Sequence, residues 1–353
     1  MTINNMKQLI KTARENKGIL IRELAQALGI DQALVSKFES GTRKPTRQQV
    51  LKLAAILDID PGELLVQWLK EKILYEIGED EYALEAMMAA ESELKQKTAL
   101  KLHVPNGIKQ IVKQIDTYKK KLDKLREYDS YRIKQALELE YTFESNRIEG
   151  NTLSLRETDL VINEGLTISG KSMREHLEAI NHSEAIAYIK YLIDKNVEIN
   201  EREVLSVHNL ILRGIDQSNA GKYRNVQVMI KGSAHHPPPP FLVPKQMEEL
   251  FYWYTSNKKQ LHPVVLAAEM HERLVTIHPF IDGNGRTSRL IMNLILLKHG
   301  YVIANIKGDT KSRMAYYHSL ETVQTGGSKS HFISLIAKYE LESIRRYVNV
   351  LAE

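Results

Sequence analysis

The stretch His278-Pro-Phe-Ile-Asp-Gly-Asn-Gly-Arg-Thr-Ser-Arg289 places a histidine, a carboxylate, two glycines and two arginines close together in the chain. The glycines argue against a helix interior, because each costs about 1 kcal/mol there relative to alanine. The apolar run within residues 287–298 predicts that a helix follows. A glycine-rich loop that leads into a helix presents unpaired N–H groups at the helix start, so this stretch predicts a phosphate-binding site.

The composition is that of an ordinary globular protein, with 43% hydrophobic and 26% charged residues among 353. This length suffices for two or three domains. The absence of cysteine excludes disulfides and cysteine chemistry and is compatible with a reducing cytoplasm. We find no signal-peptide core and no stretch of membrane-spanning length, so we expect a cytoplasmic protein without a membrane partner. The net charge of +5 permits nucleic acid binding without requiring it.

Residues 1–68 predict a small helical domain. Two short helices are expected at residues 21–28 and 32–39, where Gly29 ends the first and Asp31 caps the second. Their spacing is typical of a helix-turn-helix motif. The stretch resembles the Cro/XRE-type helix-turn-helix family of phage repressors.

This resemblance implies that the third helix of the domain enters the major groove of duplex DNA. By position, the side chains facing base edges would be Gln32, Ala33 and Lys37, and those meeting phosphates would be Lys37, Arg43, Lys44 and Arg47. The alternative is a domain that recognises protein or dimerises, since a fold does not set its function. The sequence also leaves open whether the protein forms a homodimer.

The rest of the chain predicts an all-α, mainly helical fold. Residues 69–128 are expected to form a charged helical connector, and residues 129–353 the larger domain. Residues 222–230 are the exception, because apolar and polar side chains alternate there and predict one strand of a small β-hairpin. Four prolines follow at 237–240, where they can neither continue a helix nor donate ladder hydrogen bonds.

The opening stretch matches, without a gap, the Fic-family signature His-Pro-Phe-x-Asp-Gly-Asn-Gly-Arg-x-x-Arg. Similar features extend from about residue 141 to residue 317. The resemblance implies an enzyme, a protein adenylyltransferase, that transfers AMP from ATP to a Tyr, Ser or Thr hydroxyl of a target protein or of itself. ATP would be the substrate and Mg²⁺ the cofactor.

The resemblance also implies a role for each polar residue of the signature. His278 would be the general base, because a neutral imidazole can take the hydroxyl proton, and Asp282 would hold Mg²⁺. The phosphates would be bound by glycine backbone, by an amide side chain and by two guanidinium groups: Gly283, Asn284, Gly285, Arg286 and Arg289. Glycine at 285, where a kinase-like branch of the family has lysine, favours nucleotidyl transfer over phosphoryl transfer.

Two further segments resemble parts of the family's substrate sites. The predicted strand resembles the flap that pairs with an extended segment of the target, and its candidate residues are Met229, Ile230 and Lys231. The candidates for the nucleoside pocket are Tyr316, Tyr317 and Gln324. An ordinary surface hairpin and half-buried packing tyrosines are the alternatives.

Ser145-Asn-Arg-Ile-Glu-Gly150 resembles the inhibitory motif of the family class in which the inhibitory helix precedes the Fic core. Ser145 and Glu149 are i, i+4 neighbours on one face of a helix expected at about 130–150, and Gly150 ends it. The resemblance implies that Glu149 pairs with Arg289 and denies it to the γ-phosphate of ATP. The alternative is a plain helix end with a solvated glutamate.

The sequence therefore predicts an autoinhibited adenylyltransferase joined to a DNA-binding domain. One alternative is a transcriptional regulator whose Fic domain senses ATP or modifies only itself. Others are the removal of AMP and the transfer of a different nucleotide.

Overall fold

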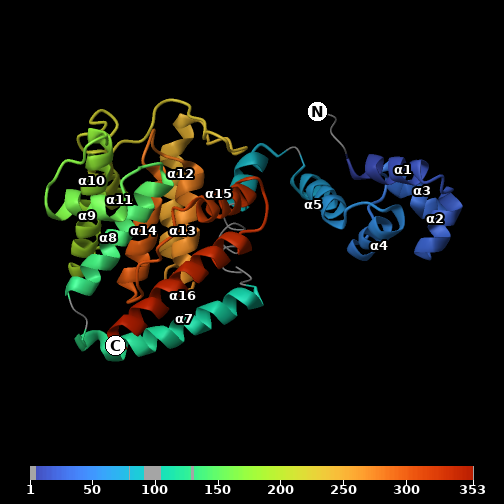
Figure 1. The fold of residues 1–353 in the computed structure, drawn as a ribbon. Helices are drawn as coiled ribbons and strands as arrows, with labels where there is room; N and C mark the ends of the chain where they lie inside the picture. The colour runs from blue at the N-terminus through green and yellow to red at the C-terminus, as the bar shows by residue number, and fades with distance from the viewer. Residues whose placement is uncertain (1–4, 79, 91–104, 129–130, 353) are drawn as a thin grey trace. The chain divides into compact units, whose positions relative to one another are not determined.

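The structure is a computed structural model that describes residues 5–78, 80–90, 105–128 and 131–352. The chain divides into two compact units, Met1–Lys95 and Gln96–Glu353. Helices account for the regular structure of both units, and no strand occurs among the described residues (Figure 1).

The first unit includes α1 (Met6–Asn16), α2 (Ile21–Leu28), α3 (Gln32–Ser40), α4 (Arg47–Leu57) and α5 (Pro61–Ile77), and residues 83–90 are helical as well. The bounds of α2 and α3 agree with the sequence prediction to within one residue. The ends follow local signals, because Asp31 accepts a hydrogen bond from Ala33 N at 2.7 Å and Gly29 and Gly41 adopt left-handed backbone conformations. An apolar core that includes Leu24, Val35 and Leu53 joins the helices.

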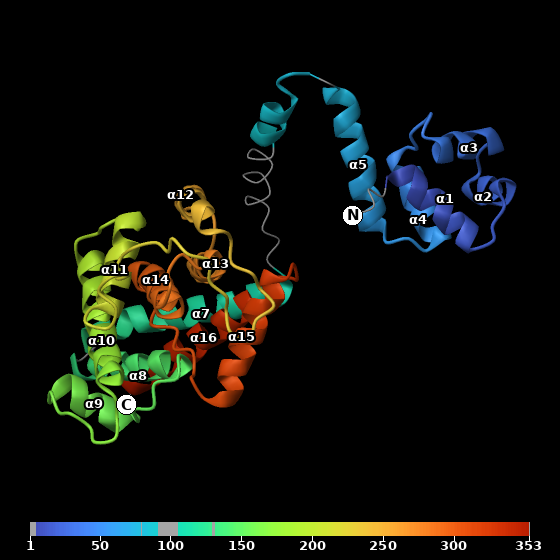
Figure 2. The same cartoon turned by 90° about the horizontal axis from the view of Figure 1, so that it is seen from above.

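The second unit is formed by α7 (Asn106–Leu125), η1 (Arg126–Tyr128), α8 (Tyr131–Ile148), α9 (Leu155–Asn163), α10 (Met173–Asp194), α11 (Glu201–Leu212), η2 (Pro240–Leu242), α12 (Val243–Asn257), α13 (Pro263–Ile277), α14 (Asn284–Lys298), α15 (Thr310–Gln324) and α16 (Ser330–Ala352). Helices α13 and α14 pack against each other at its centre, and α7 runs beside α16 along one face (Figures 1 and 2).

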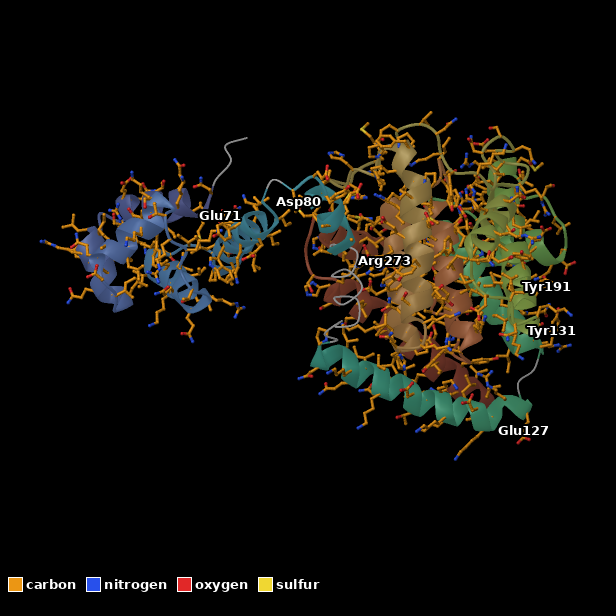
Figure 3. All side chains as sticks on the ribbon, turned by 180° about the vertical axis from the view of Figure 1, so that it is seen from behind. Glu71, Asp80, Glu127, Tyr131, Tyr191 and Arg273 are labelled. Carbon is orange, nitrogen blue, oxygen red and sulfur yellow. The ribbon has the colours of Figure 1, made fainter. Side chains whose placement is uncertain are left out.

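Helix α13 is buried on nearly all sides, as expected for the central helix of a bundle. Its polar side chains have partners. His271 Nε2 lies 3.0 Å from the Tyr316 hydroxyl, and the Arg273 guanidinium lies 4.2 Å from the Trp253 ring (Arg273 is labelled in Figure 3). The site described below is built at the carboxyl end of this rigid helix.

The predicted β-hairpin is wrong. Residues 225–231 have no regular secondary structure, and their link to the proline run is a side-chain bond from Gln227 Nε2 to Pro237 O at 2.9 Å. A ladder needs N–H donors on both arms, and residues 237–240 are prolines that have none. Alternation of apolar and polar residues alone therefore did not suffice to predict a paired strand.

The helix after the signature begins earlier than expected, at Asn284 rather than Thr287. Gly283, with φ +78°, is its N-cap, so only one glycine lies inside the helix, in the first turn where its cost is small. Among the described helices, none combines the length and the apolar composition needed to cross a membrane.

Candidate active site

The loop between α13 and α14 carries the histidine of the signature. His278 is the C-cap of α13 and adopts a left-handed conformation, with φ 51° and ψ 58°. Arg224 holds this loop in place, because its Nε donates to His278 O at 2.8 Å and its backbone N–H donates to Pro279 O at 2.9 Å. A non-glycine residue in this conformation is uncommon and points to a functional constraint.

The ring of His278 is suited to accept a proton. Its Nδ1 lies 3.4 Å from Val275 O, which favours the tautomer with the proton on Nδ1 and leaves Nε2 as the basic nitrogen. Burial lowers the pKa of His278 to about 4, and the positive charge of Arg224 acts in the same direction. The imidazole is therefore neutral at physiological pH.

A second histidine supports the loop from beneath. His208 stacks on Phe280 at 3.6 Å between ring centroids, and its Nε2 lies 2.9 Å from Asp282 O. Since the Gly221 N–H donates to Nδ1 at 3.0 Å, Nε2 carries the ring proton and donates to the loop. A Cβ at Gly283 would lie 3.3 Å from this ring, so glycine permits the close approach.

Asn284 secures the same turn from within. Its Oδ1 accepts a hydrogen bond from Phe280 N at 3.0 Å, and its Nδ2 donates to Phe280 O at 2.9 Å. The side chain predicted to donate to a phosphate thus binds the loop backbone in this structure.

The two signature arginines are almost completely buried, with 2% of Arg286 and 1% of Arg289 exposed. Arg286 lies 3.3 Å from Glu178 and 3.4 Å from Asp282. Arg286 Nε and Arg289 Nη1 have no hydrogen-bond partner among the described residues, and Arg286 Nη1 has only its ion-pair contact with Glu178. Unpaired buried donors are costly, so these groups indicate a site for an anion.

The end of α8 contacts Arg289. Ser145 accepts hydrogen bonds through its Oγ and its carbonyl from Arg289 Nε and Nη2, at 3.0 and 2.9 Å. Glu149 Oε1 accepts from Nη2 at 2.7 Å. Burial would lower the pKa of Arg289, but Glu149 more than compensates and the pKa is raised.

Glycine at 285 leaves room for this glutamate. A Cβ at this position would lie 2.4 Å from Glu149 Oε1 and 3.0 Å from Arg289 Nη1. The carboxylate of Glu149 therefore lies directly over the first turn of α14, where N–H groups attract anions.

The candidates for the nucleoside pocket differ in their exposure to solvent. Tyr316 is 1% exposed and bonds His271, so it belongs to the core. Tyr317 is 41% exposed and donates to Ile148 O at 2.9 Å, and Gln324 Nε2 lies 3.3 Å from Thr276 Oγ1. In the extended segment, Met229 is 86% exposed, Ile230 is half-buried and Lys231 is exposed.

In the first unit the candidate DNA contacts lie mostly on the surface. The exposed ones are Gln32, Ala33, Lys37, Arg43 and Arg47. Lys44 is half-buried instead, because its Nζ donates to Glu71 O at 2.6 Å and lies 4.8 Å from the Tyr75 ring (Figure 3 labels Glu71).

The residues around Asp282 fit a magnesium site that the substrate would complete. Burial would raise the pKa of Asp282, but Arg286 and Arg174 lower it, so the carboxylate is ionised. No cluster of three or more His, Cys, Asp or Glu side chains forms a closed metal site in the described part of the chain. Mg²⁺ is commonly held by one or two carboxylates together with substrate phosphates, which matches a single carboxylate beside an anion site.

Residues 198–296 match the model of the Fic/DOC family, and residues 10–64 match a helix-turn-helix family model. The chain thus carries a Fic domain and, at its N-terminal end, a Cro/XRE-type helix-turn-helix domain. Among curated proteins it is 34% identical over 218 residues to "Protein adenylyltransferase Fic" of Drosophila grimshawi, covering 62% of this chain and 44% of the relative. It is also 34% identical over 214 residues to "Protein adenylyltransferase fic-1" of Caenorhabditis elegans, covering 60% and 41%.

The chain spans less than half the length of these two relatives. Among solved structures, a Fic family protein from Desulfovibrio desulfuricans G20 is 26% identical, with a TM-score of 0.61 over 70% of this chain and 75% of that one. Fic-1 (aa134–508) from C. elegans, at 24% identity and TM-score 0.60 with 98% of each chain covered, supports the fold.

Four residues of the site escaped the sequence prediction: Arg174, Glu178, His208 and Arg224. Each lies far from the signature in sequence, and nothing in its immediate neighbourhood marks it. The one available signal was composition, since charged and histidine residues at buried helix positions need partners.

Proposed function

We propose that this protein transfers AMP from ATP to a hydroxyl group of a protein, in the target or in itself. The observation that carries the proposal is one loop-to-helix segment that holds a neutral His278 and, in the first turns of α14, two buried arginines with unpaired N–H groups. The names of the curated fly and nematode relatives support the same activity.

In the proposed reaction, His278 Nε2 takes the proton of the acceptor hydroxyl as its oxygen attacks the α-phosphorus. The new P–O bond forms while the bond between the α-phosphorus and the bridging oxygen breaks, and pyrophosphate leaves. Arg286 and Arg289 would neutralise the departing phosphates. Mg²⁺ held by Asp282 would supply additional charge neutralisation when bound.

The experiment that tests this activity compares two labels. The purified protein is incubated with Mg²⁺ and ATP labelled at the α- or at the γ-phosphate, with and without candidate acceptor proteins. We expect protein-bound label from α-labelled ATP alone. Label from the γ-position would indicate phosphoryl transfer, and label from neither position in a variant freed of Glu149 would contradict the proposal.

We propose further that Glu149 inhibits the transfer. Its contact with Arg289 at 2.7 Å occupies a donor that the γ-phosphate would need, and it lies over the anion-binding end of α14. A nucleotide that cannot seat its γ-phosphate would present its α-phosphate incorrectly to His278. The same carboxylate is compatible with a reverse reaction that removes AMP.

For the first unit we propose binding to duplex DNA. The exposed face of α3 carries Gln32 and Lys37, and Arg43 and Arg47 follow it on the surface. A regulator whose Fic domain senses ATP is the second candidate function. Variants of Gln32 and Lys37 separate the two in cells, because a regulator would lose its effect whereas a pure enzyme would keep it.

A further inference from the structure

Asp282, the carboxylate assigned to the metal, is paired with a cation from another helix. Arg174, in the first turn of α10, donates from Nη2 to Asp282 Oδ2 at 2.5 Å. The other oxygen, Oδ1, accepts from Gly283 N at 2.6 Å and lies 3.4 Å from Arg286 Nη2. Both oxygens therefore have partners within the described residues, and a metal ion that binds Oδ2 would lie against the positive charge of the Arg174 guanidinium.

Arg174 is the partner that can move. Its side chain is 56% exposed, whereas that of Arg286 is 2% exposed and the Gly283 N–H is fixed in the backbone. A half-exposed guanidinium regains water when it leaves a carboxylate, so such a pair is weak and exchangeable. Displacing Arg286 would instead leave a buried charge without its partner.

Glu178 keeps the displaced arginine at the site. Arg174 Nε donates to Glu178 Oε1 at 3.2 Å, and the same oxygen lies 3.3 Å from Arg286 Nη1. The Glu178 side chain is 10% exposed and also accepts from Asn151 Nδ2 at 3.0 Å, so its position is well determined. Arg174 can therefore release Asp282 without losing all of its bonds and can return when the metal leaves.

We propose that Arg174 is a built-in competitor of the metal, which neutralises Asp282 while the site is empty and yields it when metal and nucleotide bind. The proposal rests on the proposed function through the assignment of Asp282. It makes the charge of Arg174 a determinant of how much free Mg²⁺ the enzyme needs.

The test measures nucleotide binding rather than turnover. The Glu149→Gly/His278→Ala variant of the whole chain, in which we expect AMP transfer to be strongly reduced, is dialysed against α-labelled ATP in Mg²⁺ or in EDTA. The ratio of the two affinities isolates the contribution of the metal. We expect Arg174→Gln to raise this ratio about 1.5- to fivefold, the range of exposed ion pairs. Arg174→Lys, which keeps the charge, should stay near the parent value.

Lys190→Ala is the matched control, because it removes a positive charge from the same helix roughly 24 Å away at 1.5 Å per residue. It should leave the ratio unchanged. An unchanged or lower ratio in Arg174→Gln would overturn the proposal. Asp282→Asn should reduce the ratio strongly. If Asp282→Asn instead keeps the parent ratio of affinities, Asp282 does not hold the metal. That result would refute both its role in the proposed function and the competition between Arg174 and Mg²⁺.

Discussion

The two units place their candidate functional side chains in opposite environments. In the helix-turn-helix unit, Lys37, Arg43 and Arg47 lie on the surface above an apolar core. In the Fic unit, Arg286 and Arg289 are almost completely buried and rest against carboxylates of the same chain. Exposed cations need no partner, whereas buried ones do. The carboxylates beside Arg286 and Arg289 therefore offset a buried positive charge, and Glu149, which we propose to be inhibitory, is one of them.

The largest effect that we expect is the loss of the base. His278→Ala in the Glu149→Gly protein should reduce the initial rate of labelling from α-labelled ATP by about 10²–10⁴-fold, the usual contribution of a general base. His208→Ala is a useful comparison, since it removes a histidine that supports the loop and should also lower thermal stability. Undiminished labelling in His278→Ala would exclude the assigned role.

The buried arginine and its carboxylate give the next largest effect. Glu149→Gly should raise the labelling rate by about 5–150-fold, the range of coupling energies of 1–3 kcal/mol. The gain should disappear in Glu149→Gly/Arg289→Ala, because the released arginine is the group that acts. A Glu149→Gly rate no higher than that of the wild type would show that α8 is not inhibitory.

The pH dependence should distinguish a buried base from an exposed one. The folded-state pKa of His278 lies near 4, below the ordinary value of 6.5, so the neutral base persists as the pH falls through 6 and is lost only near 4. We expect the acid limb of kcat/KM for the Glu149→Gly protein to lie well below pH 6.5. An acid limb at pH 6.5 would mean that the pKa of His278 is not lowered, and therefore that its ring is exposed to water before substrate binds.

The same depressed pKa makes the stability of the protein depend on pH. Above pH 6.5 this histidine is neutral in both the folded and the unfolded chain. Between pH 6.5 and 4 the unfolded chain binds a proton that the folded chain does not, so the free energy of unfolding decreases as the pH falls. Wild type should therefore lose thermal stability between pH 6.5 and 4 more steeply than His278→Gln does. Equal slopes would indicate that this ring does not titrate on unfolding.

The smallest effect belongs to the exposed unit. Lys37→Ala should weaken DNA binding several-fold and reduce the slope of log K against log salt by about 0.9. Lys44→Ala should change the slope less, because Glu71 O and the Tyr75 ring already hold that side chain. Fluorescence anisotropy on genomic fragments at several salt concentrations measures both slopes, and equal slopes would remove the distinction between them.

The sequence predicted local features well and long-range ones poorly. The helix end at Gly29 and the cap at Asp31 agree with the structure, because a cap depends on its own few neighbours. The strand at 222–230 was wrong, since pairing depends on a partner that lacked N–H groups. The signature pointed to the loop but not to Arg224, which is 54 residues away in sequence, nor to Arg174, which is 108 residues away.

The double contact of Ser145 with Arg289 has a kinetic consequence. Ser145 fixes the guanidinium plane through Nε and Nη2 independently of Glu149. If Glu149 inhibits as proposed, its departure leaves the arginine preorganised. Release then requires the rotation of one partly exposed side chain, and rotamer changes of exposed side chains take picoseconds to nanoseconds. The inhibited and active forms should therefore interconvert faster than any turnover, so that labelling begins without a lag when ATP is added and its rate follows the instantaneous nucleotide concentration.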